Sequence, residues 1–270
     1  MTPNAAALRQ TCMVRALTRS CTFIVLVLSS IPGRAQQPAA PPVSAPSPGA
    51  SAALFTRAVA LYDNRNFIGA FAAFRLAADN GSVDAMMYLG MMYAGGQGTV
   101  RNYRQAIAWF GRAADAGDSQ AMCNIGSLYY QGAGASKNFD EARKWFRRGA
   151  VAGNAQAMFN LAVLYRDGSG VPVDYEEALK WLRQAAEGGS ATAMNSIGVM
   201  YQNGQGVHLD YEEAMRWFLR GANAGSGTAM YNLGVSYKEG RGVSPNADES
   251  AKWFTKASTA GEDHDPTKIP

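Results

Sequence analysis

The sequence predicts an all-α protein assembled from repeated helix–turn–helix units. Three observations predict this class: a motif that returns every 36 residues, apolar side chains at helical spacing within each copy, and capping residues at matching places in the copies. The clearest sign is the octapeptide DYEEALKW at 174–181, which returns as DYEEAMRW at 210–217. A unit of this kind cannot cover its own apolar face, so neighbouring units are expected to stack in chain order.

The segment before the repeats is predicted to be a leader followed by a spacer. Residues 1–35 hold four arginines and no acidic residue, with an apolar run at 21–31 and small residues at Gly33 and Ala35. This pattern predicts a signal peptide that is cut after Ala35, because a permanent membrane helix needs roughly 20 apolar residues. Retention of the segment as an anchor is the alternative. Residues 36–50 are rich in Pro, Ala and Ser and carry no charge, which predicts a linker.

The charge balance and the cysteine count exclude several classes of protein. Without the four leader arginines, 21 basic side chains face 21 acidic ones, so nothing favours binding to nucleic acid or to an anionic membrane. Cleavage would leave Cys123 as the one cysteine, and therefore no disulfide within the chain. His208 falls in a turn and His264 in the tail, so no metal site is expected.

Five copies of the motif follow one another over 85–261 without an insertion or a deletion. The dipeptide Ala-Met begins at 85, 121, 157, 193 and 229, and one tryptophan and one tyrosine keep the same period. The tryptophans are Trp109, Trp145, Trp181, Trp217 and Trp253. Two glycines one residue apart follow the tyrosine of each copy, as Gly168 and Gly170 do in the third. Residues 51–84 keep the register through Phe67, Ala70 and Phe74 but lack the tryptophan and this glycine pair. They are predicted to form a degenerate first unit of the tetratricopeptide type, and residues 262–270 a tail.

Within each copy, apolar side chains are spaced as on two amphipathic helices. In the third copy Ala157, Leu161 and Tyr165 form one stripe of a first helix, and Ala178 and Trp181 belong to the stripe of a second. The tryptophan is expected to enter the core. One position of the first helix is always small, which predicts close approach of the second helix. Its occupants are Gly90, Gly126, Ala162, Gly198 and Gly234.

The ends of the second helix carry capping signals. Four of the copies place Asn or Asp before the helix and Glu three residues later, which predicts a capping box with hydrogen bonds in both directions. These pairs are Asn138 and Glu141, Asp174 and Glu177, Asp210 and Glu213, and Asn246 and Glu249. Glycines that favour a left-handed conformation follow the helix at Gly117, Gly153, Gly189, Gly225 and Gly261.

The third copy, AMFNLAVLYRDGSGVPVDYEEALKWLRQAAEGGSAT at 157–192, resembles the Sel-1-like repeat family, which is related to the tetratricopeptide repeats. The resemblance implies a right-handed α–α superhelix, or solenoid, of about six helix pairs. It also implies that the first helices line a concave face.

No residue pattern typical of an active site or a cofactor site occurs. The motifs S-x-x-K and G-x-S-x-G are absent from the sequence, and Cys123 has no recurrent histidine partner. The G-x-G turns lead into acidic helix starts, which would repel a phosphate. The recurring glutamates occur once per copy along the repeat, whereas catalytic carboxylates converge on one spot. We therefore expect no enzyme activity, no metal and no cofactor.

One side of the first helix varies between copies while the core stripe does not. Positions i, i+4 and i+7 from Met87 define this side, and the resemblance places it in the concave groove. In the adjacent row, an Asn at the matching place of tetratricopeptide relatives holds a peptide backbone. The residues expected to bind a partner are Met87, Tyr88, Met91, Cys123, Asn124, Tyr130, Phe159, Asn160, Arg166, Asn195, Gln202, Tyr231, Asn232 and Lys238. The alternative is that these rows tolerate any residue.

These features predict an exported, non-enzymatic scaffold, periplasmic or secreted, that binds a protein or peptide. The resemblance suggests a regulator of envelope signalling or an assembly factor. One alternative is a hydrolase of the β-lactam type, like cysteine-rich secreted members of the family, although this chain lacks their cysteine pair in each repeat. Another alternative is a secreted factor that interacts with a host.

Overall fold

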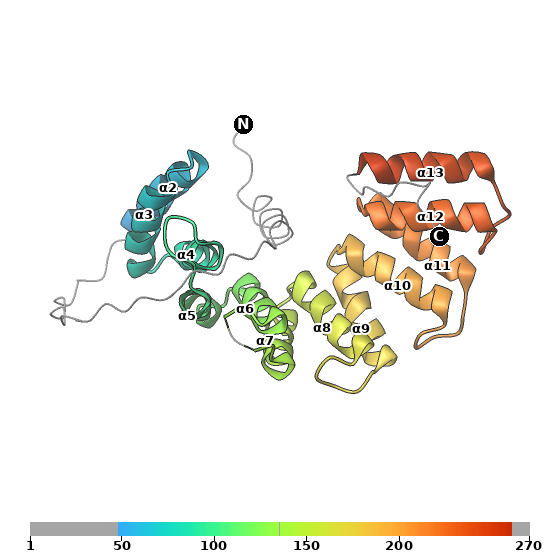
Figure 1. Ribbon diagram of the computed structural model, residues 1–270, viewed down its shortest axis with the longest axis horizontal. Helices are drawn as coiled ribbons and strands as arrows, with labels where there is room; N and C mark the ends of the chain where they lie inside the picture. Colours follow the sequence, from blue (N-terminus) through green and yellow to red (C-terminus); the bar gives the residue numbers. More distant parts are fainter. Residues whose placement is uncertain (1–47, 135, 261–270) are drawn as a thin grey trace, which may run out of the picture.

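The computed structural model describes residues 48–134 and 136–260, where the chain forms twelve α-helices and no strand (Figure 1). The all-α prediction is thus confirmed. The helices are α2 (Pro48–Asp63), α3 (Phe67–Asp79), α4 (Val83–Gly95), α5 (Tyr103–Asp115), α6 (Ser119–Gln131), α7 (Phe139–Val151), α8 (Ala155–Asp167), α9 (Tyr175–Glu187), α10 (Ala191–Asn203), α11 (Tyr211–Asn223), α12 (Gly227–Glu239) and α13 (Ala247–Thr259). The predicted signal peptide, the predicted tail and His264 lie outside the described residues. Because α2 begins at Pro48, the last three residues of the predicted linker belong to a helix.

Consecutive helices form six antiparallel pairs, from α2 with α3 to α12 with α13, and each pair packs on the next. This arrangement confirms the predicted solenoid. Figure 1 shows the pairs following one another along an arc. The first helices of neighbouring repeats contact one another, α6 with α8 and α10 with α12, whereas no two neighbouring second helices make comparable contact in the described part of the chain. The first helices therefore lie on the inner side of the arc.

The predicted helix starts are confirmed, but the capping boxes are not. Asp174 Oδ1 accepts a hydrogen bond from the Glu177 amide at 2.9 Å, and Asn138 Oδ1 accepts one from Glu141 at 3.0 Å. The return bond from the glutamate is missing, because the backbone N–H of the cap donates to the tyrosine carbonyl at the end of the first helix. For Asp174 that carbonyl belongs to Tyr165, at 2.8 Å. The glutamates bind lysine or arginine three residues later instead.

The second glycine of each pair allows close contact between neighbouring repeats. Gly170 has φ +73°, and a Cβ there would lie 2.5 Å from Cβ of Phe139, the first residue of the preceding second helix. Gly134 and Gly206 approach Tyr103 and Tyr175 in the same way. Glycine is needed here both for its backbone conformation and for its missing side chain.

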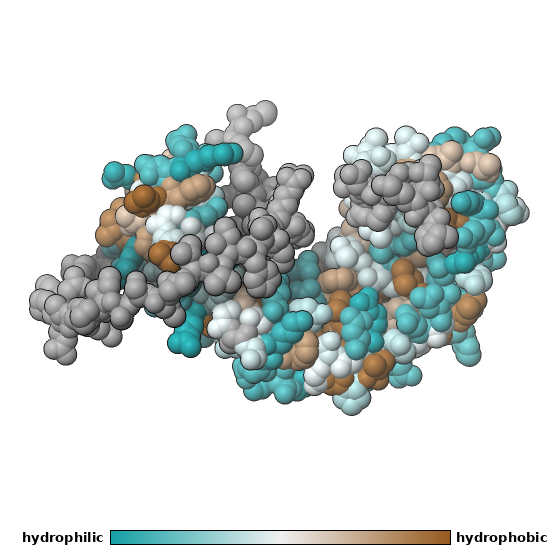
Figure 2. All heavy atoms as spheres, viewed as in Figure 1, coloured by the Kyte–Doolittle hydropathy of each residue, from teal (hydrophilic) through white to brown (hydrophobic). Residues whose placement is uncertain are grey.

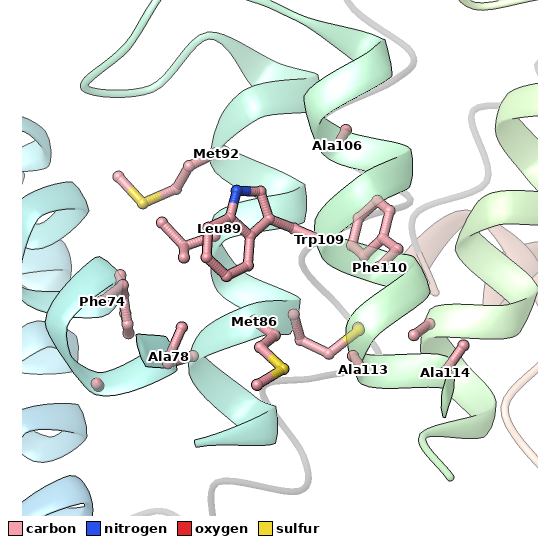
Figure 3. Close-up of a cluster of buried hydrophobic side chains, with 14 of the residues drawn as sticks. Phe74, Ala78, Met86, Leu89, Met92, Ala106, Trp109, Phe110, Ala113 and Ala114 are labelled. Carbon is pink, nitrogen blue, oxygen red and sulfur yellow. The ribbon is translucent and has the colours of Figure 1, made fainter. Parts of the chain in front are cut away.

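The residue after the tryptophan is a phenylalanine in four of the five repeats and Leu182 in the third. Phe110, Phe146 and Phe218 are fully buried, and a Cβ on Gly90, Gly126 or Gly198 would lie 2.4–2.6 Å from the corresponding ring. This contact confirms the predicted close approach of the two helices. Figure 3 shows Phe110 and Trp109 side by side on α5, with Trp109 turned toward Leu89.

The prediction that every tryptophan enters the core was wrong. Trp109 is buried, but Trp145, Trp181, Trp217 and Trp253 are only partly buried. Each of the four packs against the core of the preceding repeat. Three of the four have a cation over the ring: Arg148 lies over Trp145, Arg220 over Trp217 and Lys256 over Trp253, at 4.0–4.5 Å from the ring centroid. The tryptophans therefore cover the junctions between repeats and stay partly exposed on the outer surface.

The surface carries isolated apolar side chains rather than one apolar face. Figure 2 shows brown residues in small groups among hydrophilic ones on the face that it displays. The large exposed hydrophobic residues are Ile68, Leu76, Val100, Val151, Val173, Leu209 and Leu219. Among the described helices, none combines the length and the apolar character that crossing a bilayer requires.

Candidate partner-binding groove

The variable rows belong to the first helices, which lie on the inner side of the arc. One of these rows is half-buried in all five repeats and is mostly apolar: Met91, Ser127, Val163, Val199 and Val235. The core stripe of the same helices, such as Ala157 and Leu161 in α8, is buried against the second helices. A row that is partly exposed along successive repeats can contact a long, narrow ligand.

The predicted residues at the N-terminal end of the groove belong largely to the core. Met87 is buried in α4. The Tyr88 ring stacks on Phe74 at 4.6 Å between centroids and also meets Phe55 and Tyr62 edge-on. The sequence could not show this, because the rings that cover Tyr88 come from the degenerate first unit.

Cys123 and Asn124 also lie beneath the groove surface, with 1% and 2% of their surfaces exposed. Burial raises the pKa of the Cys123 thiol to about 12, although hydrogen bonds with Asn160 and Ser127 act in the opposite direction. Asn124 Oδ1 accepts a hydrogen bond from Gln120 at 3.1 Å. A neutral, buried thiol cannot act as a nucleophile or a metal ligand at physiological pH.

Asparagines of the first helices make hydrogen bonds between repeats. The Asn160 side chain donates to Cys123 Sγ at 3.6 Å, and Asn232 donates to Asn195 Oδ1 at 2.8 Å. Asn154, the N-cap residue of α8, donates to Gln120 of α6 at 3.2 Å. Residues 34 or 37 positions apart therefore meet between the first helices of neighbouring repeats, which spacing within one copy could not reveal.

The remaining predicted residues are half-buried or exposed on the inner side. Arg166 donates two hydrogen bonds to the adjacent Asp167, at 2.7 and 3.1 Å, and this contact raises the pKa of the guanidinium group. Tyr130 meets Phe139 edge-on, and Tyr231 lies 5.2 Å from Phe254. Phe159, Gln202 and Lys238 complete the set, and Lys238 is exposed. The accessible part of the predicted groove thus lies mainly on α8, α10 and α12.

The described residues show no cluster of three or more His, Cys, Asp and Glu side chains that could hold a metal ion. His208 is exposed in the loop before α11. The capping glutamates are held in surface ion pairs, as Glu141 with Lys144 and Glu249 with Lys252, both at 2.6 Å. The arrangement offers amides, aromatic rings and a few charges, which suit binding of a polypeptide.

Comparison with known proteins identifies the repeats. The family model described as Sel1 repeat matches residues 83–118, 119–154, 155–190, 191–226 and 227–262. Each matched segment begins at the first residue of a first helix, and the five segments follow one another without a gap. No curated protein matches the chain.

Several solved structures share the fold. A Sel1 repeat protein from Oxalobacter formigenes is 31% identical, with a TM-score of 0.68, over 77% of this chain and 85% of that one. The protein c5321 of uropathogenic Escherichia coli, described as a protective antigen with an SLR fold, is 30% identical with a TM-score of 0.71. That match covers 78% of this chain but only 46% of c5321. The immunity protein PA5088 of Pseudomonas aeruginosa is 19% identical with a TM-score of 0.55, over 82% of this chain and 85% of that one, and shares the fold alone.

Proposed function

The chain belongs to the Sel1 repeat family, whose members are generally scaffolds for protein–protein interaction, and we propose that it is a non-enzymatic scaffold that binds an extended protein segment in its inner groove. The observation that carries this proposal is the row Phe159, Asn195 and Tyr231. These three residues occupy one position in successive repeats, differ in type and are partly exposed.

The spacing of the repeats favours an extended segment as the ligand. Packed helices lie about 8–10 Å apart, and an extended chain advances about 3.3 Å per residue, so one repeat matches about three ligand residues. An aromatic ring, an amide and a second ring at this interval supply both apolar contact and hydrogen bonds. Phe159, Asn195 and Tyr231 would then contact every third side chain of the partner.

The test is capture of a partner by the purified protein, followed by the same capture with a groove variant. Phe159→Ala combined with Arg166→Ala removes an aromatic ring and a charge from the accessible part of the groove. We expect this variant to lose a partner that the unchanged protein retains. The matched control is Arg104→Ala with Gln105→Ala, two exposed residues of the second helix α5. Equal capture by the groove variant and the control would refute binding in the groove.

Export is part of the proposal, and it is supported by the arginine-rich start, the apolar run at 21–31 and the small residues at 33 and 35. N-terminal sequencing of the protein from an osmotic-shock fraction is expected to begin at Gln36. Recovery of the protein with Met1 or Met13 at its start, in the membrane fraction, would indicate a retained anchor.

A hydrolase of the β-lactam type is disfavoured by the state of Cys123. Its thiol is buried and its pKa is raised to about 12, so a thiolate nucleophile is not supported at this position. Hydrolysis of nitrocefin by the purified protein that disappears in Cys123→Ala would contradict the scaffold proposal. A role in host interaction is distinguished from a periplasmic role by where the protein is found.

A further inference from the structure

A surface pocket of about 270 Å³ lies on the side of the second helices, away from the groove, between the last two repeats. Its apolar lining consists of Met215, Leu219, Leu233, Tyr237, Val243 and Trp253. Met215 and Leu219 come from α11, Leu233 and Tyr237 from α12, and Trp253 from α13 (Figure 1). The pocket is therefore a gap between two successive second helices, with a first helix as its floor.

One substitution between repeats distinguishes this junction from the preceding one. Thirty-six residues before Leu219 and Tyr237 stand Arg183 and Tyr201, and there Arg183 donates a hydrogen bond to the Tyr201 hydroxyl at 3.1 Å. Leu219 cannot make that bond, and 45% of its surface is exposed. No side chain in the described part of the chain binds the Tyr237 hydroxyl. Met215 is half-buried, whereas Leu179 at the equivalent position is only 5% exposed.

The size and the lining of the pocket indicate what it can hold. Pockets for cofactors and drug-sized ligands measure about 300–1,000 Å³ and enclose their ligand, so this open pocket is too small for them. Methionine, tyrosine and tryptophan around a small opening are typical of sites that receive one bulky side chain from a partner protein.

The charges at the rim favour a basic neighbour for that side chain. Arg216 on α11 is shared by two carboxylates, at 2.7 Å from Glu213 and 3.7 Å from Glu212. Glu212 and Arg216 both line the pocket, with 74% and 67% of their side chains exposed, and Glu212 holds the longer contact. Together with Glu213, the α11 wall carries two carboxylates and one guanidinium group, an excess of one negative charge. On the opposite wall Lys256 lies over the Trp253 ring at 4.0 Å. A cation from a partner is therefore attracted to the α11 wall and repelled from the α13 wall.

We infer that this pocket is a second docking site, separate from the groove. Its ligand is a partner segment that inserts a leucine-like side chain beside Trp253 and places the arginine or lysine that follows it against Glu212.

Fluorescence anisotropy with labelled octapeptides tests the inference. The probe is Gly-Ser-Gly-Leu-Arg-Gly-Ser-Gly, and the two comparison peptides replace its Leu by Ala or its Arg by Glu. We expect the probe to bind at least about tenfold more tightly than either comparison peptide. Leu219→Arg restores the residue type found at Arg183 and should weaken probe binding by about tenfold or more. Leu209→Arg is the matched control, because Leu209 is also an exposed leucine but lies outside the pocket, and it should leave binding unchanged.

Several outcomes overturn the inference. They are equal binding of the three peptides, unchanged binding in Leu219→Arg, and no binding of the probe at concentrations up to about 1 mM. If sedimentation shows a dimer that Leu219→Arg dissociates, the pocket holds a second copy instead. If removal of residues 261–270 tightens probe binding about tenfold, this chain's own C-terminal segment is the occupant. The groove variant Phe159→Ala with Arg166→Ala should bind the probe normally, so the two proposed sites can fail independently.

Discussion

At the scale of the residue, Cys123 shows how a neighbouring repeat controls the chemistry of one side chain. The thiol is covered by its own helix and by Asn160 of the next repeat, whose amide lies 3.6 Å from the sulfur. Burial disfavours the thiolate more than this hydrogen bond favours it, and the pKa rises from 9.0 to about 12. The result is a cysteine that behaves as a small apolar residue.

The raised pKa predicts that the Cys123 thiol reacts slowly with alkylating reagents, even at alkaline pH. At pH 9 half of an ordinary thiol is ionised, but only about 0.1% of one with a pKa of 12, so alkylation by iodoacetamide should be about 500-fold slower. The protonated thiol stabilises the fold below the unfolded pKa, and this contribution is lost as pH rises from about 9 toward 12. Mass spectrometry across this pH range, with urea-unfolded protein as control, measures the rates. Equal rates in folded and unfolded protein at pH 9 would refute the burial of the thiol.

At this scale the sequence predicted contacts between residues a few positions apart, and it missed contacts with residues of another helix or repeat. The cap at Asp174 could be predicted, because the side chain and the amide of Glu177 are three residues apart. The missing half of the capping box could not, because the competing carbonyl belongs to Tyr165 in the other helix. Burial of Cys123 and Tyr88 depends on neighbouring units in the same way.

At the scale of the element, the third repeat uses a different pair of residues where its two helices pack most closely. Elsewhere glycine faces a phenylalanine ring, as Gly198 faces Phe218, and a Cβ on the glycine would clash. In the third repeat Ala162 and Leu182 occupy the equivalent positions, and both are fully buried in one cluster. The extra methyl group on the first helix is therefore accommodated by a smaller side chain on the second.

This exchange predicts strong coupling between the two positions. Leu182→Phe alone should destabilise the protein by about 1–3 kcal/mol, because the ring meets the Ala162 methyl group. Adding Ala162→Gly should restore much of that free energy of unfolding, with a coupling of about 0.5–3 kcal/mol measured by urea denaturation. Gly198→Ala and Phe218→Leu form the matching cycle in the fourth repeat. Simple additivity in both cycles would contradict the paired packing.

A second exchange occurs on the outside of the same repeat. Arg112 and Arg148 each lie over a tryptophan of their own helix and reach an aspartate of the preceding repeat, Asp79 at 3.8 Å and Asp115 at 3.6 Å. At the next junction the corresponding positions are Gln184 of the third repeat and Val151 of the second. Val151 is 76% exposed, and Trp181 instead donates a hydrogen bond from Nε1 to Glu177 at 2.8 Å.

Installing the missing pair should stabilise the protein modestly. Gln184→Arg with Val151→Asp adds a cation over Trp181 and a surface ion pair, each worth roughly 0.5–1 kcal/mol or less at exposed sites. We expect the double variant to raise the free energy of unfolding by about 0.5–1 kcal/mol at low salt, and by less at 1 M salt because of screening. Val151→Asn with Gln184→Arg is the control without the charge pair. An equal gain in the control would show that the ion pair contributes nothing.

At the scale of the whole molecule, the order of the helices and their stacking could be predicted from the period of 36 alone. The curvature follows from which helices touch: the first helices α6 and α8, and α10 and α12, contact one another, and second helices do not make comparable contact within the described part. The variable rows belong to these first helices, and their role in binding stays a prediction. They could not show how much of the inner side is accessible, because Met87 and Cys123 share their register with Phe159 and Tyr231 but are buried.

Equivalent junctions predict that a whole repeat can be removed. Deleting 119–154 would bring α8 and Trp181 against α5 in place of α7. The receiving residues are alike, since Ala106 and Phe110 of α5 correspond to Ala142 and Phe146 of α7, and all four are buried. We expect the shortened protein to keep its helicity per residue and a single cooperative unfolding transition, with a lower midpoint because one interface is lost.

Deleting only 137–154 removes α7 and leaves the apolar face of α6 without its partner, so that variant should lose cooperative unfolding. Circular dichroism and urea titration distinguish the two. If the full-repeat deletion unfolds like the half-repeat deletion, the junctions are not interchangeable and the stability of the solenoid depends on pairings specific to each repeat.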